Sequence, residues 1–241
     1  MALLTPRRRY GHEYLDDPAV GPRVAARSMG DVARSNALFG GAHAVLAELE
    51  DFFHPLTPGS RSFSLLDVGT GLGDIPARVR ARAAQFGVTV GTVGLDTSEA
   101  LAAAAHDATL PMLRADARRL PIADRAFDVV LCSQVLHHFR RDDGIALLRE
   151  LDRVARRRVV VSDIRRSWLA AAGIWLASWP LRFHPVSRHD GVVSVLRGFT
   201  PDELAGLVQA AIGVAPRVRR HRGFRVTAAW TPDQRNPRPQ L

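Results

Sequence analysis

The stretch Leu65-Leu-Asp-Val-Gly-Thr-Gly-Leu-Gly-Asp-Ile75 decides the fold of this chain. An apolar strand runs into glycines at alternating positions, Gly69, Gly71 and Gly73, and then into a helix. Because glycine has no Cβ atom, the backbone can turn tightly here and a ligand can approach it closely. We therefore expect a ligand-binding turn between a strand and a helix.

The spacing of these glycines differs from that of dinucleotide-binding proteins. Those proteins use G-x-G-x-x-G, in which the third glycine comes one position later. Asp67, which precedes the loop, places a carboxylate where it would repel a pyrophosphate but attract a cationic aminoacyl sulfonium. The alternative interpretation is a plain turn between packed elements with a solvated Asp67.

Strand-like and helical runs alternate around this turn. Such alternation is typical of an α/β fold, a parallel sheet with helices on both faces. We expect strands at 63–68, 88–95, 112–113, 127–132 and 159–161, helices at 75–86, 99–106 and 144–154, and a final strand pair near 214–218 and 224–229.

Three regions are expected along the chain. Residues 1–60 form an N-terminal helical cap, in which Leu38, Val45, Leu46, Leu49 and Phe53 recur at helical spacing. Residues 61–230 form the catalytic domain, with a substrate cap segment near 165–205. Residues 231–241 are rich in proline and are expected to be a disordered tail.

Two aspartates follow the next predicted strands. Asp96 ends the strand at 88–95, where an acidic side chain can accept hydrogen bonds from both hydroxyls of a ribose. Alternatively, Asp96 only favours the start of a helix that Thr97 or Ser98 caps. Asp116 follows the strand at 112–113 and could accept from an adenine amino group, although a lone aspartate is more often a loop residue.

Four sequence features occur in order along the chain: Leu66-Asp-Val-Gly-Thr-Gly-Leu-Gly-Asp74, Asp96, Asp116-Ala-Arg-Arg-Leu-Pro121 and Phe127-Asp-Val-Val-Leu-Cys-Ser-Gln-Val-Leu-His-His-Phe139. Together, they resemble the ubiquinone/menaquinone-type branch of class I S-adenosylmethionine-dependent methyltransferases. The resemblance covers roughly residues 60 to 165. It implies a doubly wound, mostly parallel seven-stranded sheet, the Rossmann-like methyltransferase fold, with S-adenosylmethionine as methyl donor.

The resemblance also assigns residues to the donor. The methionyl portion would face Asp67 and the glycines Gly69, Gly71 and Gly73, the ribose would face Asp96, and the adenine would face Asp116 and Ala117. Thr70, Thr97 and Ser133 belong to the same expected donor site.

The N-terminal segments Tyr10-Gly-His-Glu-Tyr-Leu-Asp-Asp-Pro18 and Arg27-Ser-Met-Gly-Asp-Val-Ala-Arg-Ser-Asn-Ala-Leu-Phe-Gly-Gly41 are similar to tailoring methyltransferases encoded beside bacterial type III polyketide synthases. This similarity implies an apolar aromatic or polyketide-like acceptor and a place in secondary metabolism. We expect methylation on oxygen in preference to carbon.

The acceptor should approach the loop Ser133-Gln-Val-Leu-His-His-Phe139. This loop lacks the Asn-Pro-Pro-Tyr type of motif that amino-methylating enzymes use. His138, His137 and His189 are the candidate bases because imidazole titrates near neutral pH. We expect only one of the adjacent pair to face the cleft, and Asp190 could orient His189. The alternative is a structural His137, and no residue is assigned to a metal.

Trp168, Trp175, Trp179 and Phe183 are spaced for one helical face, which Pro180 should end or kink. The face suits a core or dimer contact, or a lid over an apolar acceptor. Flanking arginines would also suit transient contact with an anionic membrane surface. We leave monomer and homodimer open.

The formal net charge is +9, and every Lys-or-Arg position is arginine. The arginines are scattered, so we expect a solvated basic surface and no specific nucleic-acid partner. A single cysteine, Cys132, excludes an internal disulfide and a cysteine-based metal cluster. Without a long apolar run or a signal peptide, a cytoplasmic protein is expected. The rival functions are methylation of RNA or another macromolecule, and a non-catalytic protein that retains the donor fold.

Overall fold

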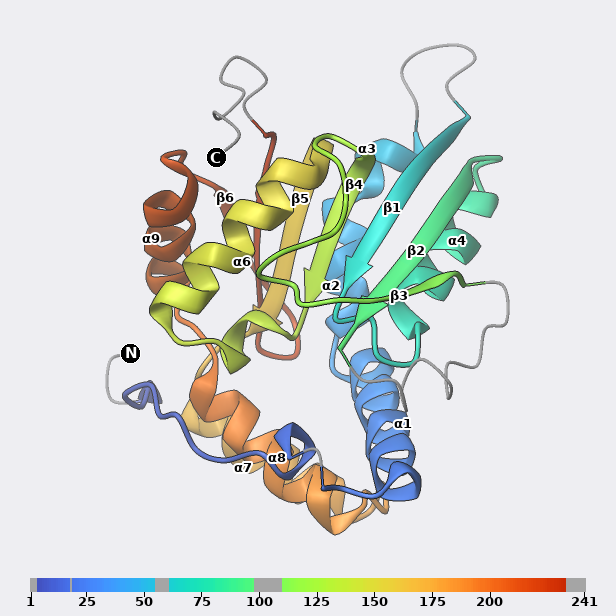
Figure 1. The fold of residues 1–241 in the computed structure, drawn as a ribbon. Coiled ribbons are helices and arrows are strands. Elements are labelled where there is room, and N and C mark those ends of the chain that lie inside the picture. The colour runs from blue at the N-terminus through green and yellow to red at the C-terminus, as the bar shows by residue number, and fades with distance from the viewer. Residues whose placement is uncertain (1–3, 18, 55–60, 98–109, 233–241) are drawn as a thin grey trace.

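The computed structural model describes residues 4–17, 19–54, 61–97 and 110–232. Its centre is a seven-stranded sheet in the order β3-β2-β1-β4-β5-β7-β6 (Figure 1). The strands are β1 Ser62–Val68, β2 Thr89–Asp96, β3 Met112–Arg114, β4 Phe127–Ser133, β5 Ala155–Ile164, β6 Arg217–His221 and β7 Arg225–Trp230. β1 to β5 pair in parallel, whereas β7 is antiparallel to both β5 and β6. The predicted doubly wound, mostly parallel sheet and its final strand pair are confirmed.

The helices cover both faces of the sheet. The described helical segments are η2 Tyr14–Asp16, α1 Pro22–Leu38, α2 Gly41–Glu48, α3 Glu50–Phe53, α4 Asp74–Ala84, η3 Leu136–His138, α6 Arg141–Val154, α7 Trp168–Ser178, α8 Pro185–Arg197 and α9 Pro201–Ile212. Each face has its own apolar core: Leu147 of α6 and Leu204 of α9 are fully buried on one face, and Val45 of α2 and Val79 of α4 on the other. The helix expected at 99–106 lies outside the described residues.

The order of the strands fixes where a ligand can bind. From β1 the chain winds outward to β2 and β3, and it then returns to place β4 on the opposite side of β1. In open α/β sheets, ligands bind beyond the carboxyl ends of the strands at this reversal. In Figure 1, the arrowheads of β1 and β4 point toward the end of the molecule where α1, α7 and α8 gather.

The N-terminal helices do not form one continuous apolar face. Leu38, which was expected to share the face of Val45 and Leu49, is 59% exposed at the end of α1. The chain turns at Gly40, where φ is +77° and an added Cβ would meet the carbonyl oxygen of Arg222 at 2.7 Å. This turn lets α2 pack against β5 and β7 while α1 extends toward α8.

Candidate functional site

A cavity of about 730 Å³ lies beyond the carboxyl ends of the central strands. This volume is within the range of roughly 300–1,000 Å³ that small-molecule sites occupy. The strand ends and the loops that follow β3 and β4 line one side, and α1, α7, α8 and the segment around η2 line the other. Residues from at least five separate stretches of chain therefore meet around it.

The glycine loop forms the floor of the cavity beside β1. Gly69, Gly71 and Gly73 all have positive φ angles, of +75°, +55° and +76°, which side chains other than glycine rarely tolerate. The amides of Gly69 and Thr70 donate to the carbonyl oxygen of Leu95 at 2.7 and 3.0 Å, which ties the loop to the end of β2. Among the three glycines, Gly69 lines the cavity directly.

Asp67 is 2% exposed, so the alternative of a solvated aspartate is wrong. Its Oδ2 accepts from the Thr70 hydroxyl at 2.8 Å, whereas its buried Oδ1 has no hydrogen-bond partner among the described residues. Burial raises the pKa of Asp67 to about 7, and the nearby Asp74 and Asp96 add to the effect. A buried carboxylate oxygen without a partner fits the approach of a cationic ligand group, as a methionyl donor would provide.

Asp96 lies at the end of β2, lines the cavity and accepts a hydrogen bond from the amide of Gly71 at 3.1 Å. Thr97 also lines the cavity. The carboxylate of Asp96 thus stands between the glycine loop and the open space, as a ribose-binding residue requires. The alternative, that Asp96 only favours the start of a helix that Thr97 or Ser98 caps, concerns residues outside the described part of the chain.

Of the remaining residues predicted to bind the donor, some line the cavity and one does not. Asp116 and Ala117 line the cavity, but the Asp116 carboxylate is paired with Arg118 at 2.8 Å. Hydrogen bonds from Arg118 lower the pKa of Asp116. Ser133 is buried, and its hydroxyl has no hydrogen-bond partner among the described residues, although the residue does not line the cavity. Their contacts with a donor remain predictions.

His137 is fixed by the adjacent ends of β4 and β5. Ser133 pairs with Ser162 in the sheet, so the loop after β4 lies beside Asp163. The Asp163 carboxylate contacts the His137 ring at Nδ1, 2.7 Å away, and accepts from the His137 amide at 3.1 Å. Although burial opposes it, His137 lowers the pKa of Asp163. The ring is therefore oriented by a carboxylate, with its Nε2 directed away from Asp163.

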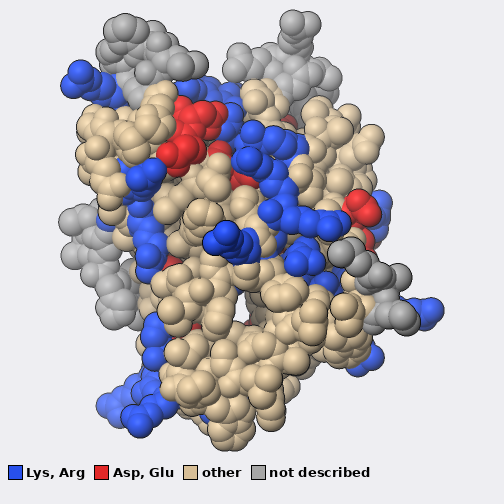
Figure 2. Space-filling view, turned by 180° about the vertical axis from the view of Figure 1, so that it is seen from behind, with Lys and Arg blue, Asp and Glu red and all other residues tan. Residues whose placement is uncertain are grey.

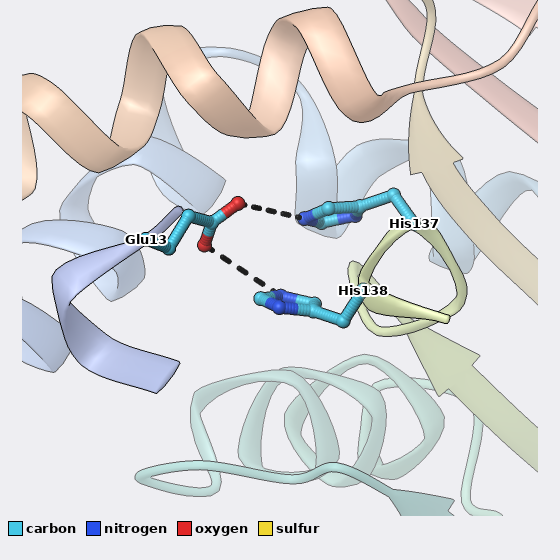
Figure 3. A group of neighbouring side chains, drawn as sticks. All are labelled: Glu13, His137 and His138. Atoms are coloured by element: carbon cyan, nitrogen blue, oxygen red, sulfur yellow. Dashed lines mark ion pairs between the residues drawn. The ribbon is translucent and has the colours of Figure 1, made fainter. Parts of the chain in front are cut away.

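His137 and His138 both line the cavity, so the expectation that only one of them faces the cleft is wrong. The chain passes through the short helix η3 here, and the two rings lie with centroids 4.3 Å apart and planes inclined by 32°. Figure 3 shows them side by side, both directed at the carboxylate of Glu13. The Nε2 atoms of His137 and His138 lie 3.9 and 3.8 Å from the Glu13 oxygens.

Carboxylates and one arginine surround this pair. Asp16 contacts Nδ1 of His138 at 2.9 Å, and Arg197 contacts both Asp16 and Glu13, at 2.8 and 3.1 Å. Although burial raises it, hydrogen bonds from His138 and Arg197 lower the pKa of Asp16 to about 2. Burial raises the pKa of Glu13, which is 3% exposed.

His189, the third candidate base, is not brought to the cavity. Its Nδ1 lies 2.8 Å from Asp190, so the two side chains do turn the same way, and its ring lies against Tyr14. Asp190 itself lines the cavity and accepts from the amides of Tyr14 and Leu15 at 2.9 and 3.0 Å. Asp190 therefore attaches the segment around η2 to α8.

The aromatic residues predicted for one helical face are divided by the end of α7. The helix ends at Ser178, before Pro180, as predicted. Trp168, Trp175 and Trp179 are 42%, 47% and 54% exposed, and they do not line the cavity, so the lid of aromatic rings is wrong. The cavity instead meets the other side of α7, at Leu169, Ala170, Gly173 and Ile174, and the buried Phe183.

Several functional candidates were missed from the sequence alone. Glu13, Asp16, Asp163 and Arg197 complete the histidine cluster, although they carry no local motif. A further feature is the pair Gln134 and Arg225, which lie 2.5 Å apart and line the cavity. Gln134 has φ of +58°, and burial lowers the pKa of Arg225 to about 10. A loop residue with a positive φ angle and a buried guanidinium can be recognised as features of a site only in the folded structure, not in the sequence.

Many basic side chains lie on the surface of the molecule. Figure 2 shows basic side chains gathered in the upper half of the face opposite to that of Figure 1, and few in its lower middle. Several arginines are paired with acids, for example Arg217 with Glu48 and Arg158 with Asp51, both at 2.6 Å. Cys132 is fully buried, and burial raises the pKa of its thiol.

Within the described residues, none of the helices combines the length and the apolar character that crossing a bilayer requires. Residues 66–161 match a family described as a methyltransferase domain. No curated protein matches the sequence.

Solved structures share the fold at low sequence identity. A SAM-dependent methyltransferase from Aquifex aeolicus has a TM-score of 0.54 and 16% identity, with 91% of this chain and 95% of that chain covered. Magnesium protoporphyrin IX methyltransferase from Synechocystis PCC 6803, with bound SAH, has a TM-score of 0.51 and 16% identity, with 84% of each chain covered. The CMeT domain of the citrinin polyketide synthase has a TM-score of 0.57 and 13% identity, with 78% of this chain and 51% of that chain covered.

Proposed function

Because this chain carries an S-adenosylmethionine-dependent methyltransferase domain, we propose that it methylates an apolar aromatic or polyketide-like small molecule on a hydroxyl oxygen. One observation carries the proposal. One cavity is lined by Gly69 of the glycine loop, by the histidine cluster and by apolar side chains of α1, α7 and α8. The similarity of the N-terminal segments to polyketide tailoring enzymes supports the proposed acceptor class.

The methyl donor would bind at the carboxyl ends of the central strands. S-adenosylmethionine supplies a methyl group on a positively charged sulfur. Asp67 and the glycine loop would hold its methionyl portion, Asp96 its ribose, and Asp116 with Ala117 its adenine. The Asp67 oxygen without a partner and the negative charge near it suit the cationic end of the donor.

The acceptor side is mostly apolar. Its walls come from α1, α7, α8 and the loop at the end of β6, and the apolar lining residues include Met29, Val32, Phe39, Ile174, Phe183, Val195 and Phe224. Such walls bind a ring or an acyl chain by removing apolar surface from water. The site is lined from several sides, which favours a small molecule over a folded RNA.

The reaction requires alignment and the removal of one proton. The acceptor oxygen forms a bond to the methyl carbon as the methyl–sulfur bond breaks, and the sulfur keeps the electron pair. The hydroxyl proton leaves toward the histidine cluster, where Asp163 orients His137 and Asp16 orients His138. The apolar walls hold the oxygen in line with the methyl group.

The proposal is tested by methyl transfer to a panel of phenols, pyrones and quinols, with His137→Gln, His138→Ala and His189→Ala assayed in parallel. His189→Ala is the matched control, because its ring also contacts an aspartate but lies outside the cavity. Replacing the residue that handles the proton should lower turnover roughly a hundredfold while donor binding stays intact. The loss should shrink toward high pH, because a phenol with a pKa near 10 then ionises unaided. Full activity of both the His137 and the His138 variants at neutral pH would refute a role for the cluster.

A further inference from the structure

Two histidines and one buried glutamate direct their free atoms at a common point in the cavity wall. One potential ligand atom from each of Glu13, His137 and His138 lies within 4.8 Å of the other two (Figure 3). The N···O separations of 3.9 and 3.8 Å are too long for direct hydrogen bonds. The three side chains face one another without bonding to one another.

The hydrogen bonds of the rings indicate what this point can hold. Each Nδ1 contacts a carboxylate, Asp163 for His137 and Asp16 for His138, and an ionised carboxylate can only accept. The Nδ1 of His137 therefore carries the proton, and in the neutral ring its Nε2 presents a lone pair. The Nδ1 of His138 lies 2.9 Å from Asp16 and 3.1 Å from the donor-only Arg197; because the shorter contact is to the carboxylate, we place the proton on Nδ1 of this ring as well. The buried Nε2 of His137 has no hydrogen-bond partner among the described residues. Two lone pairs and a carboxylate directed at one point call for a cation.

We propose that Glu13, His137 and His138 bind a first-row divalent metal ion such as Zn²⁺. Two atoms that bind one tetrahedral zinc ion at about 2.0–2.2 Å lie about 3.3–3.6 Å apart, so the N···O separations of 3.9 and 3.8 Å must shorten by a few tenths of an ångström. Imidazole nitrogen suits zinc and its neighbours, whereas Mg²⁺ and Ca²⁺ prefer oxygen ligands.

The surroundings of the three ligands have the form that metal sites require. Ligating histidines usually donate their other ring N–H to a carboxylate, which fixes the ring and strengthens the ligand. Both rings meet this condition here. Glu13 is held in turn by the Ser194 hydroxyl at 2.9 Å and by Arg197 at 3.1 Å. Three protein ligands leave a coordination position open, as in catalytic zinc sites, and all three ligand residues line the cavity.

The role of the ion rests on the proposed function, whereas its binding does not. A hydroxyl that reaches the open position loses its proton more readily, because a bound divalent ion lowers the pKa of the hydroxyl. The ion would then take over the task that the two imidazoles perform as bases in the metal-free protein. The acceptor would be methylated as the oxygen anion, with its proton released to water.

The test is calorimetric titration of the chelator-treated full chain with Zn²⁺, with Co²⁺ absorption as a second readout of the coordination. About one ion should bind per chain, and Glu13→Gln and His138→Ala should each weaken binding by roughly a hundredfold or more. Asp16→Asn should weaken it roughly 10–100-fold, since this carboxylate supports His138 and pairs with Arg197 without binding the ion itself. His189→Ala should bind zinc as the unchanged chain does, and donor binding reports that every variant is folded.

Equal zinc binding by the unchanged chain, Glu13→Gln and His138→Ala would overturn the site, because the ion would then be held by other histidines. Absence of stoichiometric binding would overturn it as well. Since these titrations contain no acceptor, they can fail while methyl transfer to the phenol panel succeeds. Zinc binding without methyl transfer would count against the proposed acceptor class alone.

Discussion

At the scale of single residues, Asp67 has the clearest energetic consequence. Its burial raises the pKa from 3.8 to about 7, which corresponds to about 4 kcal/mol. The pKa of Asp67 is higher in the folded than in the unfolded state. Its contribution to the free energy of unfolding is therefore most favourable at low pH, and it decreases as pH rises toward 7. The same carboxylate, once ionised, attracts a cationic donor.

We predict that ionisation of Asp67 lowers the stability of the ligand-free protein between about pH 4 and pH 7, and that Asp67→Asn removes this contribution, so that the variant gains stability relative to the unchanged chain as pH rises. Denaturant unfolding across this range measures it. Asp128→Asn is the control: despite partial burial, hydrogen bonds from Ser64 and Arg156 lower the pKa of Asp128, so its effect has the opposite sign. Donor affinity should rise through the same range in the unchanged chain and not in Asp67→Asn. A stability profile that Asp67→Asn leaves unaltered would contradict the account of this carboxyl.

The glycine loop gives a second prediction at this scale. In Gly69→Ala, the new Cβ would overlap Cγ2 of Val135, and alanine disfavours the φ of +75°. We expect donor affinity measured by calorimetry to fall at least about tenfold, which is 1.4 kcal/mol. Gly206→Ala on α9 is the matched control because its Cβ would meet open space. Equal donor affinity of the two variants would show that Gly69 does not bound the donor site.

At the scale of elements, the strands around the glycine loop follow from local chemistry. Short apolar runs such as 129–132 are typical of strands that are buried on both faces of a parallel sheet, and the glycines favour a turn at the carboxyl end of β1. The core fold and the position of Asp96 beside the loop were therefore predictable from the sequence. The orientation of α7 was not, because a helix that is apolar nearly all round does not reveal which side meets the cavity.

The exposed side of α7 suggests a surface role. Arg9 lies over the Trp168 ring at 5.6 Å and Arg188 over the Trp179 ring at 3.7 Å, so tryptophans and cations alternate on one surface. This combination suits the interface of an anionic membrane. The opposite side of α7 lines the cavity, so a membrane bound to the exposed side would lie close to the cavity.

We predict that the protein sediments with vesicles that contain anionic lipid and that Trp175→Ser weakens this binding about tenfold or more. Raised salt should weaken it further, because the arginine contribution is screened. Phe86→Ser, which removes an aromatic ring that is 36% exposed elsewhere on the surface, should leave vesicle binding unchanged. A concentration-dependent dimer that Trp175→Ser dissociates, without vesicle binding, would instead assign this face to a second copy of the chain.

At the scale of the whole molecule, the candidate site is assembled from distant parts of the chain. Glu13 and Arg197 are 184 positions apart in the sequence, yet they meet at 3.1 Å. No periodicity or motif connects them, so reasoning from the sequence found the histidines and missed their partners. The donor half was predictable because one strand–turn–helix unit carries most of it, whereas the acceptor half depends on how α1, α7 and α8 pack.

The rival reading, methylation of RNA, draws on the net charge of +9. On the face drawn in Figure 2, basic side chains gather in the upper half, whereas the cavity wall is mostly apolar. A phosphate backbone gains nothing from such a wall, while a ring or an acyl chain does. The shape and the lining of the cavity therefore favour the small-molecule acceptor.

The most direct measurement incubates the purified chain with methyl-labelled S-adenosylmethionine and offers it either the panel of phenols, pyrones and quinols or bulk RNA. Mass spectrometry then identifies the methylated product and the methylated atom. The account predicts methyl transfer to a hydroxyl oxygen of an apolar aromatic or pyrone-like compound and none to RNA. An inert panel together with labelled RNA would contradict it.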